Sequence, residues 1–181
     1  MTALRDTLRR LLGGDGLPDG FAARLGPDER VLATARTADG AHLVVTSWGL
    51  WVPDGDGARR ISWHLVSKAT WRNGALAVVE AVDVEEIASG DGPVAVLLAD
   101  RPARRFRLAD PGRVPEAVQA RVEASIRSRH RRDLPGGGAW FVQRKIAGRD
   151  GTVLQVRPDP GTDPQVVAQV VGDVVRSRTS R

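Results

Sequence analysis

The sequence predicts a fold of the α+β class, and three successive patterns carry this prediction. Between residues 30 and 108, apolar and polar residues alternate in about seven short runs separated by turn residues, which is typical of an all-β sandwich or barrel. From Val114 to Ile126 a valine or isoleucine then recurs every four residues, the spacing of an amphipathic helix. A hairpin and a second helix are expected after residue 135.

Turn residues divide the β region into hairpins. Ala38-Asp39-Gly40 closes the first hairpin. Asn73-Gly74 joins strands expected at 67–72 and 75–82, because both residues tolerate the positive φ of a type I′ turn. Residues 83–92 are rich in carboxylates and are interpreted as an acidic loop.

The amphipathic helix is expected to run from Val114 to about Arg132 and to bury its apolar stripe against the strands. Gly136-Gly137-Gly138 is interpreted as a flexible joint. A hairpin at 140–146 and 152–157 should follow this joint.

The last helix is indicated by a start signal and a period. Asp163-Pro164 supplies an N-cap residue followed by the proline favoured at the first helical position. Pairs of valines then recur every four residues.

We therefore expect three parts: an amphipathic helix with a glycine-rich linker at 1–20, a main domain at 21–134, and a hairpin plus helix at 135–181. The third part is too short to hold a core alone, so it should dock on the main domain.

The order of these elements resembles a known family. The stretches His42–Val52 (HLVVTSWGLWV), Ile61–Val66 (ISWHLV) and Ala69–Trp71 (ATW) resemble uncharacterised bacterial PH-like and GRAM-like domains over residues 28–132. The resemblance implies a PH-like bent antiparallel β-barrel of about seven strands, capped by a C-terminal amphipathic helix. The first hairpin turn has no cluster of Lys or Arg, so phosphoinositide binding by that turn is not expected.

Composition narrows the protein class. The net charge is +5, with 25 Arg and only 2 Lys, a skew that GC-rich genomes such as those of actinobacteria impose on many proteins. The chain has no cysteine, which excludes disulfides and thiol nucleophiles. No apolar run is long enough to cross a bilayer, and residues 1–12 lack the pattern of a secretory signal. We expect a cytoplasmic protein without a transmembrane segment.

The residues that could support catalysis are few: three His, no Cys and no Tyr. His64 lies beside Ser62 and Ser67, but no third group is placed to orient its imidazole. The turn Asp54–Gly57 lacks the later ligands of a calcium loop. The sequence therefore predicts a protein that is not an enzyme and has no cofactor and no metal.

Two groups of residues are candidate interaction surfaces. Trp63 and Trp71 fit core positions, whereas the odd spacing of Trp48 and Trp51 predicts that one of them is exposed or is covered by the C-terminal hairpin. Trp140-Phe141 should anchor that hairpin or face a partner. The second surface is the basic cluster at the end of the 114–132 helix, formed by Arg127, Arg129, Arg131 and Arg132.

The first interpretation is a non-catalytic PH-like binding or scaffolding module with an unknown protein partner. The alternative is a binder of polyanions, either nucleic acid or an anionic membrane surface, through the arginine-rich end of the helix. No aromatic residue interleaves the arginine run, so the sequence gives base stacking no support. Salt-resistant retention on heparin that depends on Arg129, Arg131 and Arg132 would distinguish the two.

Overall fold

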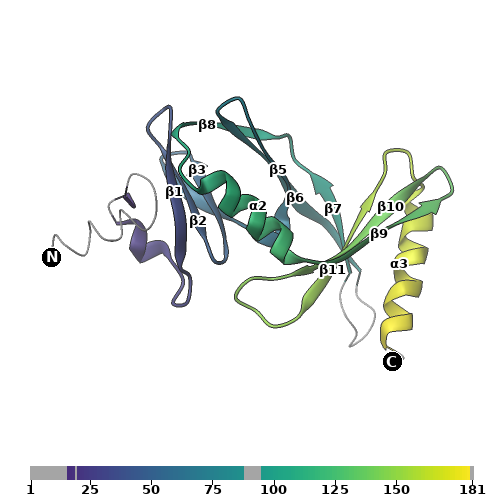
Figure 1. The fold of residues 1–181 in the computed structure, drawn as a ribbon. Helices are drawn as coiled ribbons and strands as arrows, with labels where there is room; N and C mark the ends of the chain where they lie inside the picture. The colour runs from purple at the N-terminus through teal and green to yellow at the C-terminus, as the bar shows by residue number, and fades with distance from the viewer. Residues whose placement is uncertain (1–15, 19, 88–94, 180–181) are drawn as a thin grey trace. The chain divides into compact units, whose positions relative to one another are not determined.

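A computed structural model describes residues 16–18, 20–87 and 95–179 of the 181-residue chain (Figure 1). The helix expected at residues 1–12 lies outside the described residues. The chain divides into two compact units that do not follow chain order. Unit 1 holds the residues up to Glu80 together with 102–124 and 147–149, and unit 2 holds 81–101, 125–146 and the residues from 150 onwards.

Unit 1 is an antiparallel sheet with one α-helix. Its elements are η1 (Phe21–Arg24), β1 (Val31–Thr37), β2 (His42–Thr46), β3 (Gly49–Asp54), β4 (Gly57–Ser62), η2 (Trp63–Leu65), β5 (Val66–Arg72), the first half of β6 (Ala75–Ile87), β8 (Arg104–Asp110) and α2 (Val114–Ser125). The strands follow the order β4-β3-β2-β1-β8-β6, and β5 pairs with β6. Asn73 and Gly74 have φ of 51° and 71°, so the predicted β5–β6 turn is confirmed.

The core of unit 1 lies between these strands and α2. Val114 and Val118 of α2 are fully buried and share one cluster with strand residues such as Leu43 and Leu50, as the four-residue spacing predicted. Trp63 is in the same cluster and is 2 % exposed, which confirms its core position. Trp71 is 38 % exposed on β5, so the prediction that it is a core residue is wrong.

Unit 2 is a smaller sheet with α3 packed on one face. Its elements are the second half of β6, β7 (Ala95–Asp100), β9 (Ile126–Leu134), β10 (Gly137–Lys145), β11 (Thr152–Pro158) and α3 (Pro164–Thr179). β10 lies between β9 and β11, and β11 pairs with β7 in parallel. Val167 and Val171 of α3 are fully buried against Phe141 and Val156 of the sheet. The predicted hairpin and last helix are therefore present.

The predicted PH-like barrel is wrong. The described residues are mostly β, with 54 % in strands and 20 % helical, and eleven strands form one mixed sheet that is not closed. β6 continues to Ile87, past the strand end expected at residue 82, so residues 83–87 pair with β7 instead of forming a loop. β7 in turn pairs with β11, and the strand path ends at β4 and β9. A barrel needs its terminal strands to pair with each other, and these do not.

The predicted helix end is also wrong. α2 stops at Ser125, and the arginine-rich residues Ile126–Leu134 form strand β9. A helix through this run would place Arg127 and Arg131 at i and i+4, where like charges repel. As a strand, this run instead pairs with β10 from Ile126 to Leu134, with one register shift beside Arg144. The arginine cluster therefore lies on a strand and not at a helix C-terminus.

The three glycines interpreted as a flexible joint are closely packed. Pro135-Gly136 connects β9 to β10, and the φ of 82° at Gly136 is the left-handed value that the third position of a type II turn requires. A Cβ on Gly137 would lie 2.6 Å from Thr162 Oγ1, and one on Gly138 would lie 2.7 Å from a guanidinium nitrogen of Arg131. Other groups approach the backbone so closely at both positions that a residue with a Cβ would not fit without a shift.

Candidate functional site

The six predicted interaction residues fall in different units. Trp48 and Trp51 belong to unit 1, and Arg127, Arg129, Arg131 and Arg132 belong to β9 in unit 2. The two tryptophans and the four arginines therefore belong to different units.

Trp51 helps to enclose a buried carboxylate. Glu29, whose side chain is 0 % exposed, accepts hydrogen bonds from Thr46 Oγ1 at 2.5 Å, from Trp51 Nε1 at 3.0 Å and from Arg60 at 2.5 Å. Its Oε2 also accepts the backbone N–H of Gly26 at 3.1 Å. Burial raises the pKa of Glu29, but these hydrogen bonds and the charge of Arg60 outweigh it, so the pKa lies below its ordinary value.

Trp48 and Trp51 are both half-buried parts of this cluster. The Arg60 guanidinium lies 5.3 Å from the ring centroid of Trp48 and 5.7 Å from that of Trp51. Trp48 also packs tightly against two backbone segments: a Cβ on Gly26 or Gly148 would come within 2.3 Å or 2.8 Å of its indole. The two rings thus stabilise unit 1, and neither is displayed as a free surface aromatic.

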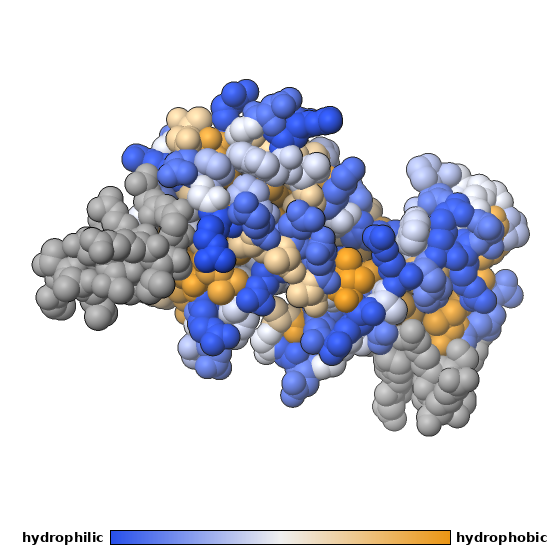
Figure 2. Space-filling model, in the orientation of Figure 1, coloured by the Kyte–Doolittle hydropathy of each residue, from blue (hydrophilic) through white to orange (hydrophobic). Residues whose placement is uncertain are grey.

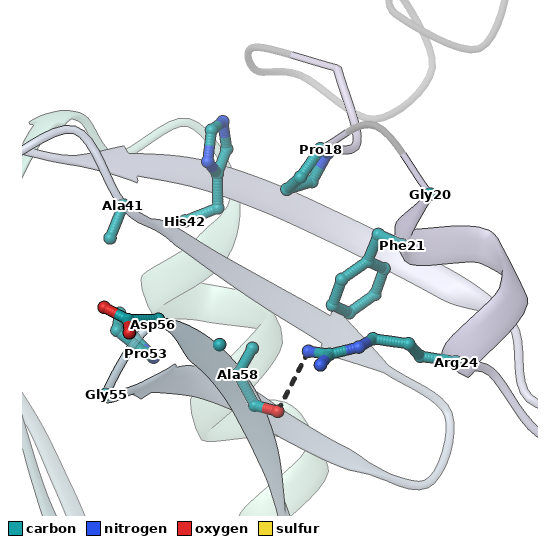
Figure 3. Close-up of a pocket in the computed structure, with 11 residues that line it drawn as sticks. Pro18, Gly20, Phe21, Arg24, Ala41, His42, Pro53, Gly55, Asp56 and Ala58 are labelled. Carbon is teal, nitrogen blue, oxygen red and sulfur yellow. Dashed lines mark hydrogen bonds between the residues drawn. The ribbon is translucent and has the colours of Figure 1, made fainter.

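A pocket of about 510 Å³ opens in unit 1 (Figure 3). Phe21, His42 and Asp56 line it together with several proline and glycine residues. Arg24 also lines it and donates a hydrogen bond to the carbonyl of Ala58 at 3.1 Å (Figure 3). The described lining holds no serine or threonine hydroxyl beside the imidazole, so it offers no nucleophile–base pair.

A second pocket of about 500 Å³ lies between the β1–β2 turn and β8 in unit 1. Residues 104–107 of β8 line it, opposite Thr37 and Asp39. Arg104 already donates to the Pro53 carbonyl at 2.6 Å, and its guanidinium lies 5.1 Å from the ring centroid of Phe106. The Arg104 side chain therefore already has partners within unit 1.

His64, the histidine considered for catalysis, is half-buried in the short turn η2 and not on a strand. Within the described part of the chain, no three residues of the types His, Cys, Asp and Glu are grouped to hold a metal ion. No described helix is both long enough and apolar enough to cross a membrane.

β9 has the highest net positive charge of the described strands. It is the last strand of the sheet order and pairs with β10 alone. Its nine residues include four arginines, and residues 127–133 are all exposed. Strand alternation directs Arg129 and Arg131 to one face and His130 and Arg132 to the other. Both faces of this edge strand are therefore basic.

β10 places an aromatic residue beside these arginines. Trp140 is 39 % exposed, whereas its neighbour Phe141 is fully buried beneath α3. Trp140 lies directly opposite Arg131 of β9, and the Arg129 guanidinium lies 6.0 Å from its ring centroid. On the other face, His130 stacks on Phe141 with the ring centroids 5.7 Å apart and the planes 8° apart. Where Figure 1 draws β9, β10 and α3, Figure 2 shows mostly hydrophilic side chains around a hydrophobic patch.

Carboxylates hold one of the arginines in place. Arg131 pairs with Asp159 at 2.6 Å and with Asp133, and the hydrogen bond and charge of Asp159 raise the pKa of Arg131 above its ordinary value. The same guanidinium packs against the backbone of Gly138. Arg131 thus braces the β9–β10 hairpin, while Arg127, Arg129 and Arg132 remain as exposed cations on the same strand.

The sequence analysis found the arginines but missed Trp140 as their neighbour. The signal that could have joined them is local: Pro135-Gly136 is a turn signal that reverses the chain after the arginine run and brings Trp140 back toward it. Comparison with known proteins adds no further site residues, because no family model, curated protein or solved structure matches the chain.

Proposed function

We propose that this chain is a non-catalytic binding protein whose ligand is a polyanion with the repeated phosphates of a nucleic acid, held along β9. The observation that carries the proposal is the exposed edge strand with four arginines in nine residues. Arginine suits this ligand because its planar guanidinium makes bidentate hydrogen bonds to phosphate oxygens.

The spacing of the charges supports an extended ligand. A strand rises about 3.3 Å per residue, so the exposed cations Arg127, Arg129 and Arg132 are spread along β9 rather than gathered in a compact cluster. A compact anion would meet only one or two of these guanidinium groups, whereas a chain of phosphates can follow the strand. The arginine side chains also discourage pairing of β9 with a second copy of itself, because like charges would oppose each other.

Binding to a protein partner stays a prediction. Trp48 and Trp51, the residues expected to form the surface for that partner, are half-buried around Glu29 and Arg60 and so give this prediction little support. The pockets of unit 1 add no catalytic pair to the proposal. A cytoplasmic location, where nucleic acid is accessible, is part of the proposal.

Salt dependence of binding tests this function. Binding of a labelled mixed-sequence 20-nucleotide DNA would be followed by fluorescence anisotropy between 50 and 300 mM salt. The triple variant Arg127→Ala, Arg129→Ala, Arg132→Ala should reduce the slope of log K against log salt by roughly 2, since each lost phosphate contact contributes about 0.7 for a single strand. Arg131 is left unchanged because it braces the hairpin.

A matched control removes the same charge from unit 1. Arg36, Arg105 and Arg113 are exposed, and their joint replacement by alanine should leave the salt slope nearly unchanged. Equal effects of the two triple variants would mean that net charge, and not β9, attracts the oligonucleotide. Absence of binding by the parent chain at 150 mM salt would remove the proposed function.

A further inference from the structure

Trp140 is a partly exposed aromatic residue that lies beside the arginines of β9. It alternates with Phe141, so one ring faces α3 and is fully buried while the other faces away and is 39 % exposed. An indole left exposed in the middle of a basic surface loses burial energy that a ligand could restore. Trp140 is therefore a candidate contact for an apolar part of the ligand.

Arginines flank Trp140 on both neighbouring strands. The sheet register places Arg131 of β9 and Arg157 of β11 directly opposite Trp140. Side chains directly opposite each other in adjacent antiparallel strands lie on the same face, so the indole stands in a row between two guanidinium groups. Asp159 holds Arg131 at 2.6 Å, and Asp100 holds Arg157 at 2.7 Å. The row is thus braced before any ligand arrives.

The fourth member of this face is Arg129, which lies 6.0 Å above the Trp140 ring centroid. Arginine planes and indole rings both stack on nucleobases, and their combination with phosphate-binding charges is the usual arrangement in proteins that bind single strands. A base can use this face only if its own π-face is free. In a duplex both faces of each internal base are already stacked.

We infer that the polyanion is a single-stranded nucleic acid, and that one unpaired base stacks on Trp140 and Arg129 while the phosphates lie along the arginines of β9. This inference rests on the proposed function and names its ligand class. Duplex DNA and anionic membranes would use the charges of β9 but would not stack on the partly exposed indole of Trp140.

The first test needs no substitution. Fluorescence anisotropy at 150 mM salt would measure the affinity of the full chain for three labelled ligands. These are a 12-nucleotide single-stranded DNA, the same sequence as single-stranded RNA, and the 12-base-pair DNA duplex. The inference expects at least one of the single strands to bind roughly tenfold more tightly than the duplex, and the two single strands show whether the sugar matters. Equal or tighter binding of the duplex would overturn it.

The second test removes the indole. Trp140→Leu should weaken single-strand binding by about 5- to 150-fold, the loss expected for one stacked base, while retention on heparin, which has no bases, stays within about twofold. Trp140→Phe should recover much of the loss. Trp71→Leu is the matched control, because Trp71 is 38 % exposed on β5 of unit 1. It should change the binding of neither the single strand nor heparin. Circular dichroism and thermal unfolding would show that each variant is folded.

The outcomes separate the inference from the proposed function. If heparin and oligonucleotides bind but Trp140→Leu and Trp140→Phe leave single-strand affinity unchanged, the stacking inference fails and polyanion binding stands. If the chain binds vesicles of 70 % phosphatidylcholine and 30 % phosphatidylserine more tightly than any oligonucleotide, the ligand is an anionic membrane surface and not a nucleic acid. This outcome would overturn the inference. If the parent chain binds neither heparin nor oligonucleotide, both proposals fail.

Discussion

The indole of Trp51 donates its N–H to the carboxylate of Glu29 at 3.0 Å, and the same carboxylate oxygen accepts the hydroxyl of Thr46. Glu29 precedes β1, Thr46 ends β2, and Trp51 lies in β3, so one buried carboxylate connects three neighbouring segments of unit 1. Arg60 on β4 supplies the balancing charge at 2.5 Å. Such a group is stabilising only while its partners remain in place.

Replacing this carboxylate should destabilise the protein. Glu29→Gln retains the shape but removes the charge and turns an amide N–H₂ toward groups that are themselves donors. We expect a loss of about 2 kcal/mol in the free energy of unfolding, measured in urea. Glu85→Gln, at an exposed position of β6, is the control and should lie within about 0.5 kcal/mol of the parent. A Glu29→Gln variant as stable as the parent would show that the network contributes nothing.

The same residue predicts a pH dependence. The pKa of Glu29 in the folded protein lies below its ordinary value of 4.5. Its contribution is therefore fully present above that ordinary value and is lost as the pH falls through the lower folded-state pKa. The difference in unfolding free energy between the parent and Glu29→Gln should be largest near pH 7 and should shrink below pH 4.5. A difference that grows on acidification would contradict the assigned direction.

Gly26 should not tolerate a side chain. A Cβ at this position would lie 2.3 Å from Cζ3 of Trp48, far inside van der Waals contact. Gly26→Ala should therefore cost about 1–3 kcal/mol through overpacking. Gly16→Ala is the control, because nothing lies within 4 Å of its added Cβ. Adding Trp48→Leu to Gly26→Ala should recover part of the lost stability. If the stability change of the double variant equals the sum of the two single changes, the strain does not come from contact between these two residues.

The β9–β10 turn should depend on glycine at position 136. Its φ of 82° strains any residue with a Cβ, and that Cβ would lie 3.0 Å from the carbonyl oxygen of Gly161. We expect Gly136→Ala to lower stability by about 1–2 kcal/mol. It should also speed amide hydrogen exchange in β9 and β10 more than in β2 and β3. Uniform exchange across both units would argue against a local effect.

The start of α3 should depend on its cap. Asp163 Oδ1 accepts the backbone N–H of Gln165 at 2.9 Å, which satisfies one of the first free donors of the helix. Asp163→Ala should cost about 1 kcal/mol, and Asp163→Ser, which keeps a capping oxygen, should cost much less. Thermal unfolding followed by circular dichroism measures both. Equal losses in the two variants would mean that the cap oxygen is not what stabilises this end.

Several elements could be predicted from short stretches of sequence because their causes are local. The four-residue spacing that begins at Val114 identified the buried face of α2, and Asp163-Pro164 identified the start of α3. Asn73-Gly74 identified a hairpin because its backbone angles depend on those two residues alone. The arginines of the candidate site were also evident, since a run of like charges needs no structure to be recognised.

The sequence by itself determined which residues alternate, which turns close and where positive charge gathers. Only the tertiary structure decided what pairs with what: β7 joins β11 in parallel, residues 126–134 become a strand along β10, and Trp140 arrives opposite Arg131. The physical reason is that a period assigns a side chain to a face, whereas the partner across that face comes from a distant part of the chain and is selected by the backbone hydrogen bonds and burial of the whole sheet.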